Sequence, residues 1–113
     1  MSLAADRNTI RIRELNDAFR TTFHGGRVML TAGFNALPEA VRSRALRQLK
    51  SFTAFEPGND PHGEHDFGSF EVAGETFFWK IDCYDERCEF GSEDPSDPKK
   101  TTRVLTVMLA EEY

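Results

Sequence analysis

The sequence predicts a single α+β domain, in which two N-terminal helices pack on one face of a small, mainly antiparallel sheet of about four strands. Apolar residues recur at helical spacing in the first half of the chain, and they alternate at strand spacing in the second half. The length of 113 residues suits one domain, and ten phenylalanines supply bulky side chains for its core. We therefore expect one domain over residues 1–113, with residues 1–7 as a flexible tail.

Two helices and a short strand are expected in the first half of the chain. A helix over residues 8–23 is indicated by an apolar stripe, and the glycines at positions 25 and 26 can end it. This stripe consists of Ile12, Leu15, Phe19 and Phe23. A strand over residues 27–31 follows, and Pro38 then begins a second helix that runs to about residue 52.

Three further strands are expected in the second half, over residues 69–72, 75–84 and 102–110. Ala73-Gly74 is a two-residue connection that suits a tight hairpin between the first two of them. In the long strand we expect one face to be buried, formed by Phe77, Trp79, Ile81 and Cys83. The other face is mixed, so we expect it to be partly exposed; it carries Phe78, Lys80, Asp82 and Tyr84.

Charge is divided unevenly along the chain, whose formal net charge is −5. Residues 1–50 hold nine Lys or Arg against four Asp or Glu, whereas residues 51–113 hold five against fifteen. The two halves either complement each other within one fold or present two oppositely charged surfaces to partners. Residues 56–68 and 87–100 are rich in Pro, Gly and acidic side chains, and we expect both segments to be exposed loops.

No stretch of the sequence approaches the length of apolar chain that a membrane helix needs, and the first residues lack the apolar core of a signal peptide. We expect a cytoplasmic protein without membrane contact. In that compartment Cys83 and Cys88 would remain reduced thiols. We expect no cofactor, and the sequence leaves the oligomeric state open.

Four segments of the chain resemble a family of short uncharacterised proteins that occur in alphaproteobacteria and are often linked with plasmids. These segments are GGRVMLTAGFNALP, NDPHGEHDFGSFEV, FFWKIDCYD and SEDPSDPKKTTRVLTVMLAEEY. The motif at residues 63–68 matches the family pattern directly, whereas the positions of His62 and Cys83 are often tyrosine in the family. The resemblance implies a bacterial cytoplasmic setting and an accessory role in mobile elements, including interference with host defence. It implies no established activity.

The densest group of polar residues lies in the first acidic loop and consists of Asp60, His62, Glu64, His65 and Asp66. Imidazole and carboxylate groups can bind a divalent metal or transfer protons, so Glu64, His65 and Asp66 are candidate catalytic residues. The alternative is a structural loop in which Asp66 caps backbone N–H groups and a carboxylate holds His65. A histidine beside two carboxylates leaves both interpretations open.

A closed zinc site is a further possibility, with His62, His65, Cys83 and Cys88 as its four ligands. Two arguments weaken it: Cys83 shares the predicted buried face of Trp79, and the resemblance implies that tyrosine can replace His62 and Cys83. A structural zinc site would not accept tyrosine in these places.

Nucleic-acid binding would use the basic side of the second helix, formed by Arg42, Arg44, Arg47 and Lys50. The acidic second half of the chain would repel a phosphate backbone, and the helices show no base-reading motif, so we do not expect this partner.

The leading hypothesis is a small non-enzymatic accessory protein that binds a partner protein with a basic surface through its acidic loops. The acids expected to make this contact are Asp60, Glu64, Asp66, Glu93, Asp94 and Asp97. The alternative is a metal-dependent or acid–base enzyme centred on the loop Gly63-Glu64-His65-Asp66.

Overall fold

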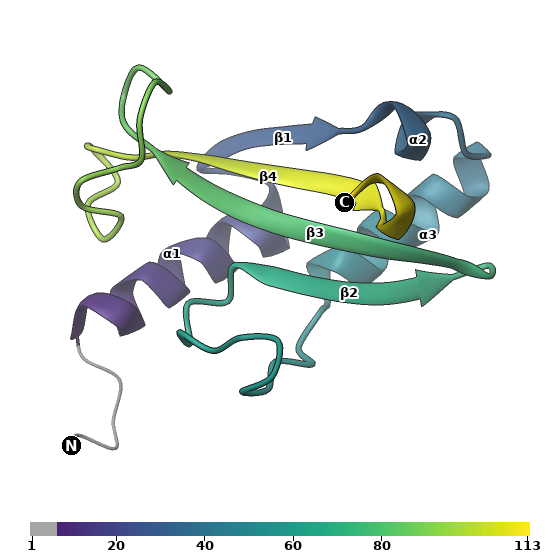
Figure 1. Ribbon diagram of the computed structural model, residues 1–113, viewed down its shortest axis with the longest axis horizontal. Helices are drawn as coiled ribbons and strands as arrows, with labels where there is room; N and C mark the ends of the chain where they lie inside the picture. Colours follow the sequence, from purple (N-terminus) through teal and green to yellow (C-terminus); the bar gives the residue numbers. More distant parts are fainter. Residues whose placement is uncertain (1–6) are drawn as a thin grey trace.

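The computed structural model describes residues 7–113, and the fold is the predicted α+β arrangement of helices and one sheet (Figure 1). Most of the expected tail, residues 1–6, lies outside the described residues. Arg7, the last residue of that expected tail, is the first residue of a helix. In chain order the elements are α1 (Arg7–Thr22), β1 (Gly26–Leu30), α2 (Ala32–Asn35), α3 (Glu39–Lys50), β2 (Phe67–Val72), β3 (Glu75–Tyr84), β4 (Thr102–Leu109) and the 3₁₀ helix η1 (Ala110–Glu112).

The sheet has the strand order β1-β4-β3-β2, and it is mainly antiparallel as predicted. Strands β2, β3 and β4 form antiparallel pairs in sequence order, joined at Ala73-Gly74 and by the long loop after β3. The exception is β1, which runs parallel to β4. The first and last strands of the chain are therefore neighbours, and β1 and β2 form the two edges.

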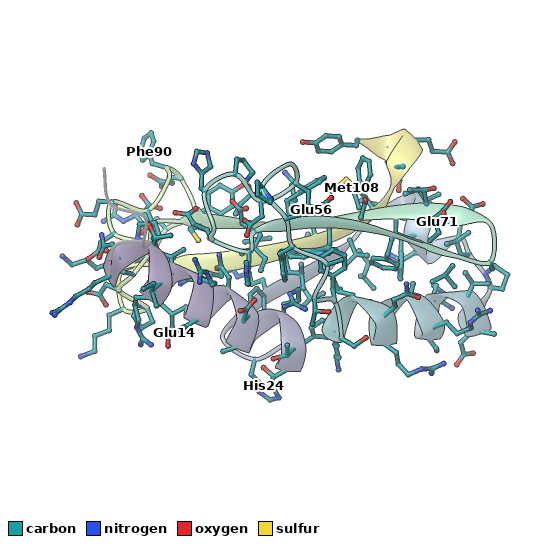
Figure 2. The ribbon with its side chains drawn as sticks, turned by 90° about the horizontal axis from the view of Figure 1, so that it is seen from below. Glu14, His24, Glu56, Glu71, Phe90 and Met108 are labelled. Atoms are coloured by element: carbon teal, nitrogen blue, oxygen red, sulfur yellow. The ribbon has the colours of Figure 1, made fainter. Side chains whose placement is uncertain are left out.

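Both long helices lie on one face of this sheet, and Figure 2 shows them as one layer below it. The predicted buried face of β3 lies against them: Phe77 and Trp79 are fully buried, and they meet Leu105 and Val107 of β4. From the helices the core receives Phe19, Ala45 and Leu49. Cys83 packs against the edge of this cluster and remains partly exposed. The sequence thus identified the core-facing side of β3 correctly.

Two short elements, α2 and η1, were not predicted because three or four residues are too short to show a period. The two elements are held together by hydrogen bonds. Thr31 caps α2, and the carboxylate of Glu112 accepts hydrogen bonds from Thr31 Oγ1 at 2.6 Å, Gly33 N at 3.0 Å and Leu109 N at 2.8 Å. Phe34 of α2 is fully buried against Phe77, so this contact between distant segments closes one end of the core.

The opposite face of the sheet carries no long helix, and Figure 2 shows Met108 and Glu71 on this side, whereas Glu14 and His24 lie on the helix side. The register of the strands defines this open face. Its side chains include Arg27 and Met29 of β1, Thr106 and Met108 of β4, Phe78, Lys80 and Asp82 of β3, and Phe67, Ser69 and Glu71 of β2. All of these except Met108 are partly or fully exposed, and the three of β3 are partly exposed, as we predicted for this side of β3.

No helix within residues 7–113 combines the length and the apolar surface that crossing a bilayer would require.

Candidate functional site

The first acidic loop, which ends at residue 66 in the structure because β2 begins at Phe67, comprises residues 53–66. Two side chains of α1 fix it by hydrogen bonds to the backbone of the loop. Arg13 donates from Nε to the carbonyl oxygen of Gly63 at 2.6 Å, and Asn16 donates from Nδ2 to that of Glu64 at 2.9 Å. Asn16 is almost fully buried, so its bond is shielded from water. The loop that the sequence marked as a site is thus part of the packed structure.

His65 lies at the centre of this loop and makes contacts on several sides. Its Nδ1 is 2.9 Å from both carboxylate oxygens of Asp17, and its Nε2 is 3.5 Å from Oδ2 of Asp60. Because the Asp17 carboxylate can only accept, Nδ1 carries the proton. One face of the imidazole stacks on Phe55, with ring centroids 3.7 Å apart and planes inclined by 2°. The backbone N–H of His65 also donates to Oδ1 of Asp60 at 3.1 Å.

Arg20 extends this network into the core. Its Nη2 is 3.1 Å from Oδ1 of Asp17, and its Nη1 donates to the carbonyl oxygen of Leu49 at 3.0 Å. The guanidinium lies 5.4 Å from the Phe55 ring centroid and 5.3 Å from that of Trp79. Asp17, His65 and Arg20 thus join the loop, α1 and the end of α3.

This arrangement favours the structural alternative for His65. Proton transfer to a substrate would require one ring nitrogen to leave a carboxylate, and Phe55 covers one face of the ring. Asp60 is buried with 8% of its surface exposed, and it holds His65 from the opposite side to Asp17. The surface that a partner could contact therefore does not include Asp60 or His65.

The candidate metal ligands do not converge. Among residues 7–113 no group of three or more His, Cys, Asp or Glu side chains is placed to hold a metal ion. His62 is exposed at the tip of the first loop, and Cys83 lies at the core side of β3. Burial raises the pKa of the Cys83 thiol, although the nearby Arg103 acts in the other direction. Cys88 lies in the turn after β3, and both cysteines are free thiols.

The second acidic loop, residues 85–101, is anchored through Arg103 at the start of β4. Arg103 is buried, and it donates from Nη2 to the carbonyl oxygen of Pro95 at 2.5 Å and from Nε to Oδ1 of Asn16 at 2.7 Å. Asn16 therefore holds the first loop with its amide NH₂ group and the second loop, through Arg103, with its amide oxygen. The two acidic loops are linked by one buried pair of side chains.

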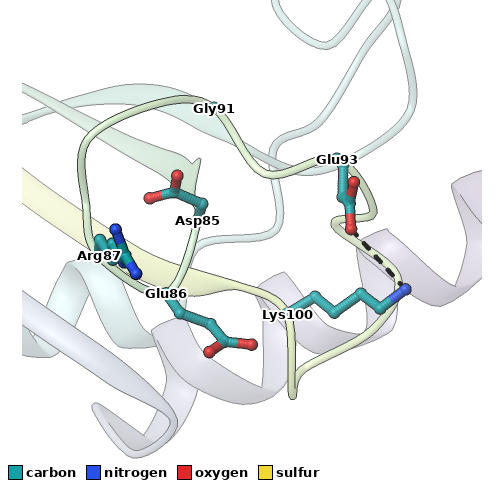
Figure 3. A pocket seen from close by; sticks show the side chains of 6 residues that line it. All are labelled: Asp85, Glu86, Arg87, Gly91, Glu93 and Lys100. Atoms are coloured by element: carbon teal, nitrogen blue, oxygen red, sulfur yellow. Dashed lines mark ion pairs between the residues drawn. The ribbon is translucent and has the colours of Figure 1, made fainter.

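The aspartates of the second loop shape the loop itself. Asp94 accepts from the backbone N–H and hydroxyl of Ser96, and Asp97 accepts from the backbone N–H of Lys99. Glu93 is exposed and lies 3.8 Å from Nζ of Lys100. Figure 3 shows this pair at the rim of a hollow of about 330 Å³, whose other lining residues are Asp85, Glu86, Arg87 and Gly91.

Glu64 and Asp66 are half-buried, and burial is the main cause that raises the pKa of both carboxyl groups. Neighbouring carboxylates raise both further, while His62 opposes the shift. Ionisation of Asp66 is thus disfavoured mainly by burial, and a hydrogen bond from its own backbone N–H opposes this rise of its pKa in part. Asp66 comes directly before Phe67, and both residues line one hollow at the edge of the open face.

The basic residues of α3 are on the other side of the molecule. Arg44, Arg47 and Lys50 are exposed on the helix layer, and Arg42 donates from Nε to the carbonyl oxygen of Leu37 at 3.0 Å. Nζ of Lys50 lies 4.4 Å from the Phe23 ring centroid. The helix layer therefore carries several exposed cations, and the two loops carry several exposed acids.

Sequence reasoning missed Asn16, Asp17 and Arg103, which hold the site together. They belong to elements far from the loops in sequence, and no local pattern connects residue 16 with residue 103. One signal was present: Asn16 and Arg20 interrupt the buried side of an amphipathic helix, and buried polar side chains need partners.

Comparison with known proteins gives one match. No curated protein and no solved structure matches the chain. A model of a family described as a protein of unknown function, DUF3768, matches residues 30–112, which include both acidic loops and the strands β2, β3 and β4. The chain belongs to this family, DUF3768.

Proposed function

We propose that the protein is a small non-enzymatic binding protein, which takes a partner protein with a basic surface onto its two acidic loops and the open sheet face. The observation that carries this proposal is the shared anchoring of the two loops by Asn16 and Arg103. Loops that are fixed on a rigid scaffold present their exposed side chains in one arrangement, which lowers the entropy cost of binding.

The charge of these loops supports the chemistry of the partner. Glu56 of the first loop and Glu86, Glu89 and Glu93 of the second are exposed. Exposed carboxylates contribute little to folding stability, but together they attract a basic surface from a distance. Such attraction raises the association rate and weakens as salt is added.

The biological setting is a further part of the proposal. The resemblance described above suggests the cytoplasm of a bacterium and an accessory role in a mobile genetic element, including one directed against host defence. An acidic surface would suit that role if it occupied the basic groove of a host protein.

Affinity capture from a lysate of the native host tests the proposal, with a matched pair of charge-reversal variants. Glu56→Lys with Glu93→Lys changes one exposed acid in each loop. Glu14→Lys with Glu39→Lys changes the net charge equally on the helix layer, where Figure 2 shows Glu14. We expect the wild type and the helix variant to retain the same partner at low salt, and the loop variant to lose it. Recovery of no partner, or equal loss in both variants, would contradict the proposal.

A further inference from the structure

The open face holds a hollow of about 370 Å³ where β2 and β3 meet the first acidic loop. His62 comes from the loop, and Lys80 and Asp82 come from β3. The lining also includes Asp66, Phe67 and Tyr113. A strand surface, a loop and the C-terminal segment thus meet at one depression on the side that no long helix covers.

The apolar side of this hollow is a group of three aromatic rings. The centroid of Tyr113 lies 5.2 Å from that of Phe78 and 5.9 Å from that of Phe67, and the last two are 5.4 Å apart. Tyr113 has 75% of its surface exposed, so much of its ring remains open to a ligand. Aromatic faces carry negative potential and attract cations, guanidinium groups above all.

The polar side of the hollow has one carboxylate without a cation as partner. Nζ of Lys80 lies 3.1 Å from Oδ2 of Asp82, so these two charges compensate each other. Asp66 has no such ion pair among residues 7–113, and its carboxylate accepts a hydrogen bond from its own backbone N–H. Asp66 lines the same hollow as Phe67 and Tyr113, and a carboxylate together with aromatic rings is complementary to a planar cation.

We propose that this hollow receives an arginine side chain of the partner protein, which pairs with Asp66 and stacks on Tyr113 and Phe67. This inference rests on the proposed function and names the group by which the partner is held. Arginine fits better than lysine because its guanidinium can donate two hydrogen bonds to one carboxylate while its plane lies on a ring. An apolar side chain would leave Asp66 buried without a partner, which opposes binding.

A titration with Nα-acetyl-arginine amide, followed by amide chemical shifts of the ¹⁵N-labelled protein, tests this inference. We expect saturable shifts at residues 66–67, 80–82 and 113, with a dissociation constant on the order of 1 mM. Asp66→Asn should weaken binding about tenfold or more, because one tenfold step corresponds to the loss of a single modest polar contact. Glu89→Gln removes an exposed acid in the second loop and should change the constant less than about twofold.

Lys80→Met gives a second test, in which binding is expected to change in the opposite direction. The variant removes a cation that would repel the incoming guanidinium, and it leaves Asp82 without its ion-pair partner. Binding should become several-fold tighter, at roughly twofold to fivefold. Nα-acetyl-norleucine amide, which has no charge, should give no saturable shifts at the same residues. The inference is overturned if the two amides bind alike, if Asp66→Asn binds arginine as the wild type does, or if Lys80→Met weakens binding.

These outcomes are distinct from a failure of the proposed function. If the arginine derivative does not bind, but partner capture still depends on Glu56 and Glu93, the loops bind a partner without this pocket. If capture fails while the arginine derivative binds at Asp66, the pocket recognises a guanidinium and the loop surface is not its partner site.

Discussion

Replacement of Asn16 by alanine should loosen both acidic loops together, although Asn16 lies in α1 and belongs to neither of them. The change removes the donor to the Glu64 carbonyl oxygen and the acceptor for Nε of Arg103. A buried polar group left without its partner costs about 1–3 kcal/mol, and more when it is charged. Since two groups lose their partners, we expect the free energy of unfolding to fall by about 2–5 kcal/mol.

Urea unfolding followed by Trp79 fluorescence measures this change, with Asn8→Ala as the matched control in the same helix. Asn8 is exposed, and its replacement should alter stability by less than about 0.5 kcal/mol. Amide hydrogen exchange should be faster in both residues 60–66 and residues 93–100 of the Asn16→Ala protein. If the role of Asn16 were confined to α1, hydrogen exchange in the two loops would not become faster.

A double-mutant cycle tests whether Asn16 acts through its hydrogen bond with Arg103. Arg103→Met removes the other half of the pair, so its effect and that of Asn16→Ala should not add, and a coupling of about 1 kcal/mol or more is expected. Additive effects, or a cost of Asn16→Ala below about 0.5 kcal/mol, would refute the reasoning, because a typical buried hydrogen bond contributes more than this.

Three further predictions concern other parts of the fold. Gly68→Ala should destabilise the protein by about 1–3 kcal/mol in urea unfolding, since an added Cβ would lie 2.5 Å from Nε1 of Trp79 in a packed core. Glu112→Gln should lower the melting temperature at neutral pH, and the difference should vanish as acid protonates Glu112, whose pKa is lowered mainly by the hydrogen bond from Thr31. Asp66→Asn should raise the melting temperature at pH 7, because burial raises the pKa of Asp66 and ionisation therefore opposes folding; this gain should disappear below a pH of about 3.9, where the unfolded side chain is also protonated. Melting curves between pH 3 and pH 8 measure the last two effects, and an Asp66→Asn protein less stable than the wild type at pH 7 would contradict our account of that carboxylate.

The fold was predictable where apolar residues repeat often enough to reveal their period. Ten residues of β3 alternate between the core and the open face, so the burial of Phe77 and Trp79 followed from their spacing. The four residues of α2 contain no full period, and the burial of Phe34 depends on a capping contact with Glu112, which lies at the other end of the chain. β1 was expected as a strand, but local sequence does not indicate that it runs parallel to β4.

The site was predictable in composition and not in geometry. Clustering drew attention to His65 and its neighbouring acids, and His65 does lie among carboxylates. Its main partner, Asp17, is separated from it by 48 positions, so sequence could not distinguish a proton-transfer group from a structural one. Asp66 was also a candidate from the sequence, but its burial and its lack of a cation partner could not be predicted, because both depend on the side chains that surround it in space.

The exposed acids of the two loops lie away from the exposed cations of α3, so one small domain carries charges of opposite sign on different parts of its surface. Buried Arg20 donates to the carbonyl oxygen of Leu49 in α3 and pairs with Asp17. Buried Arg103 donates to the carbonyl oxygen of Pro95 in the second loop. The exposed glutamates are then free to face solvent, where their mutual repulsion is screened by salt. Among residues 7–113, Asp66 and Glu64 both have a pKa raised mainly by burial and no ion pair, so the charge of Asp66 opposes folding unless a ligand compensates it. A residue that opposes folding in the free protein, and is stabilised when a cation arrives, is better explained by binding than by packing.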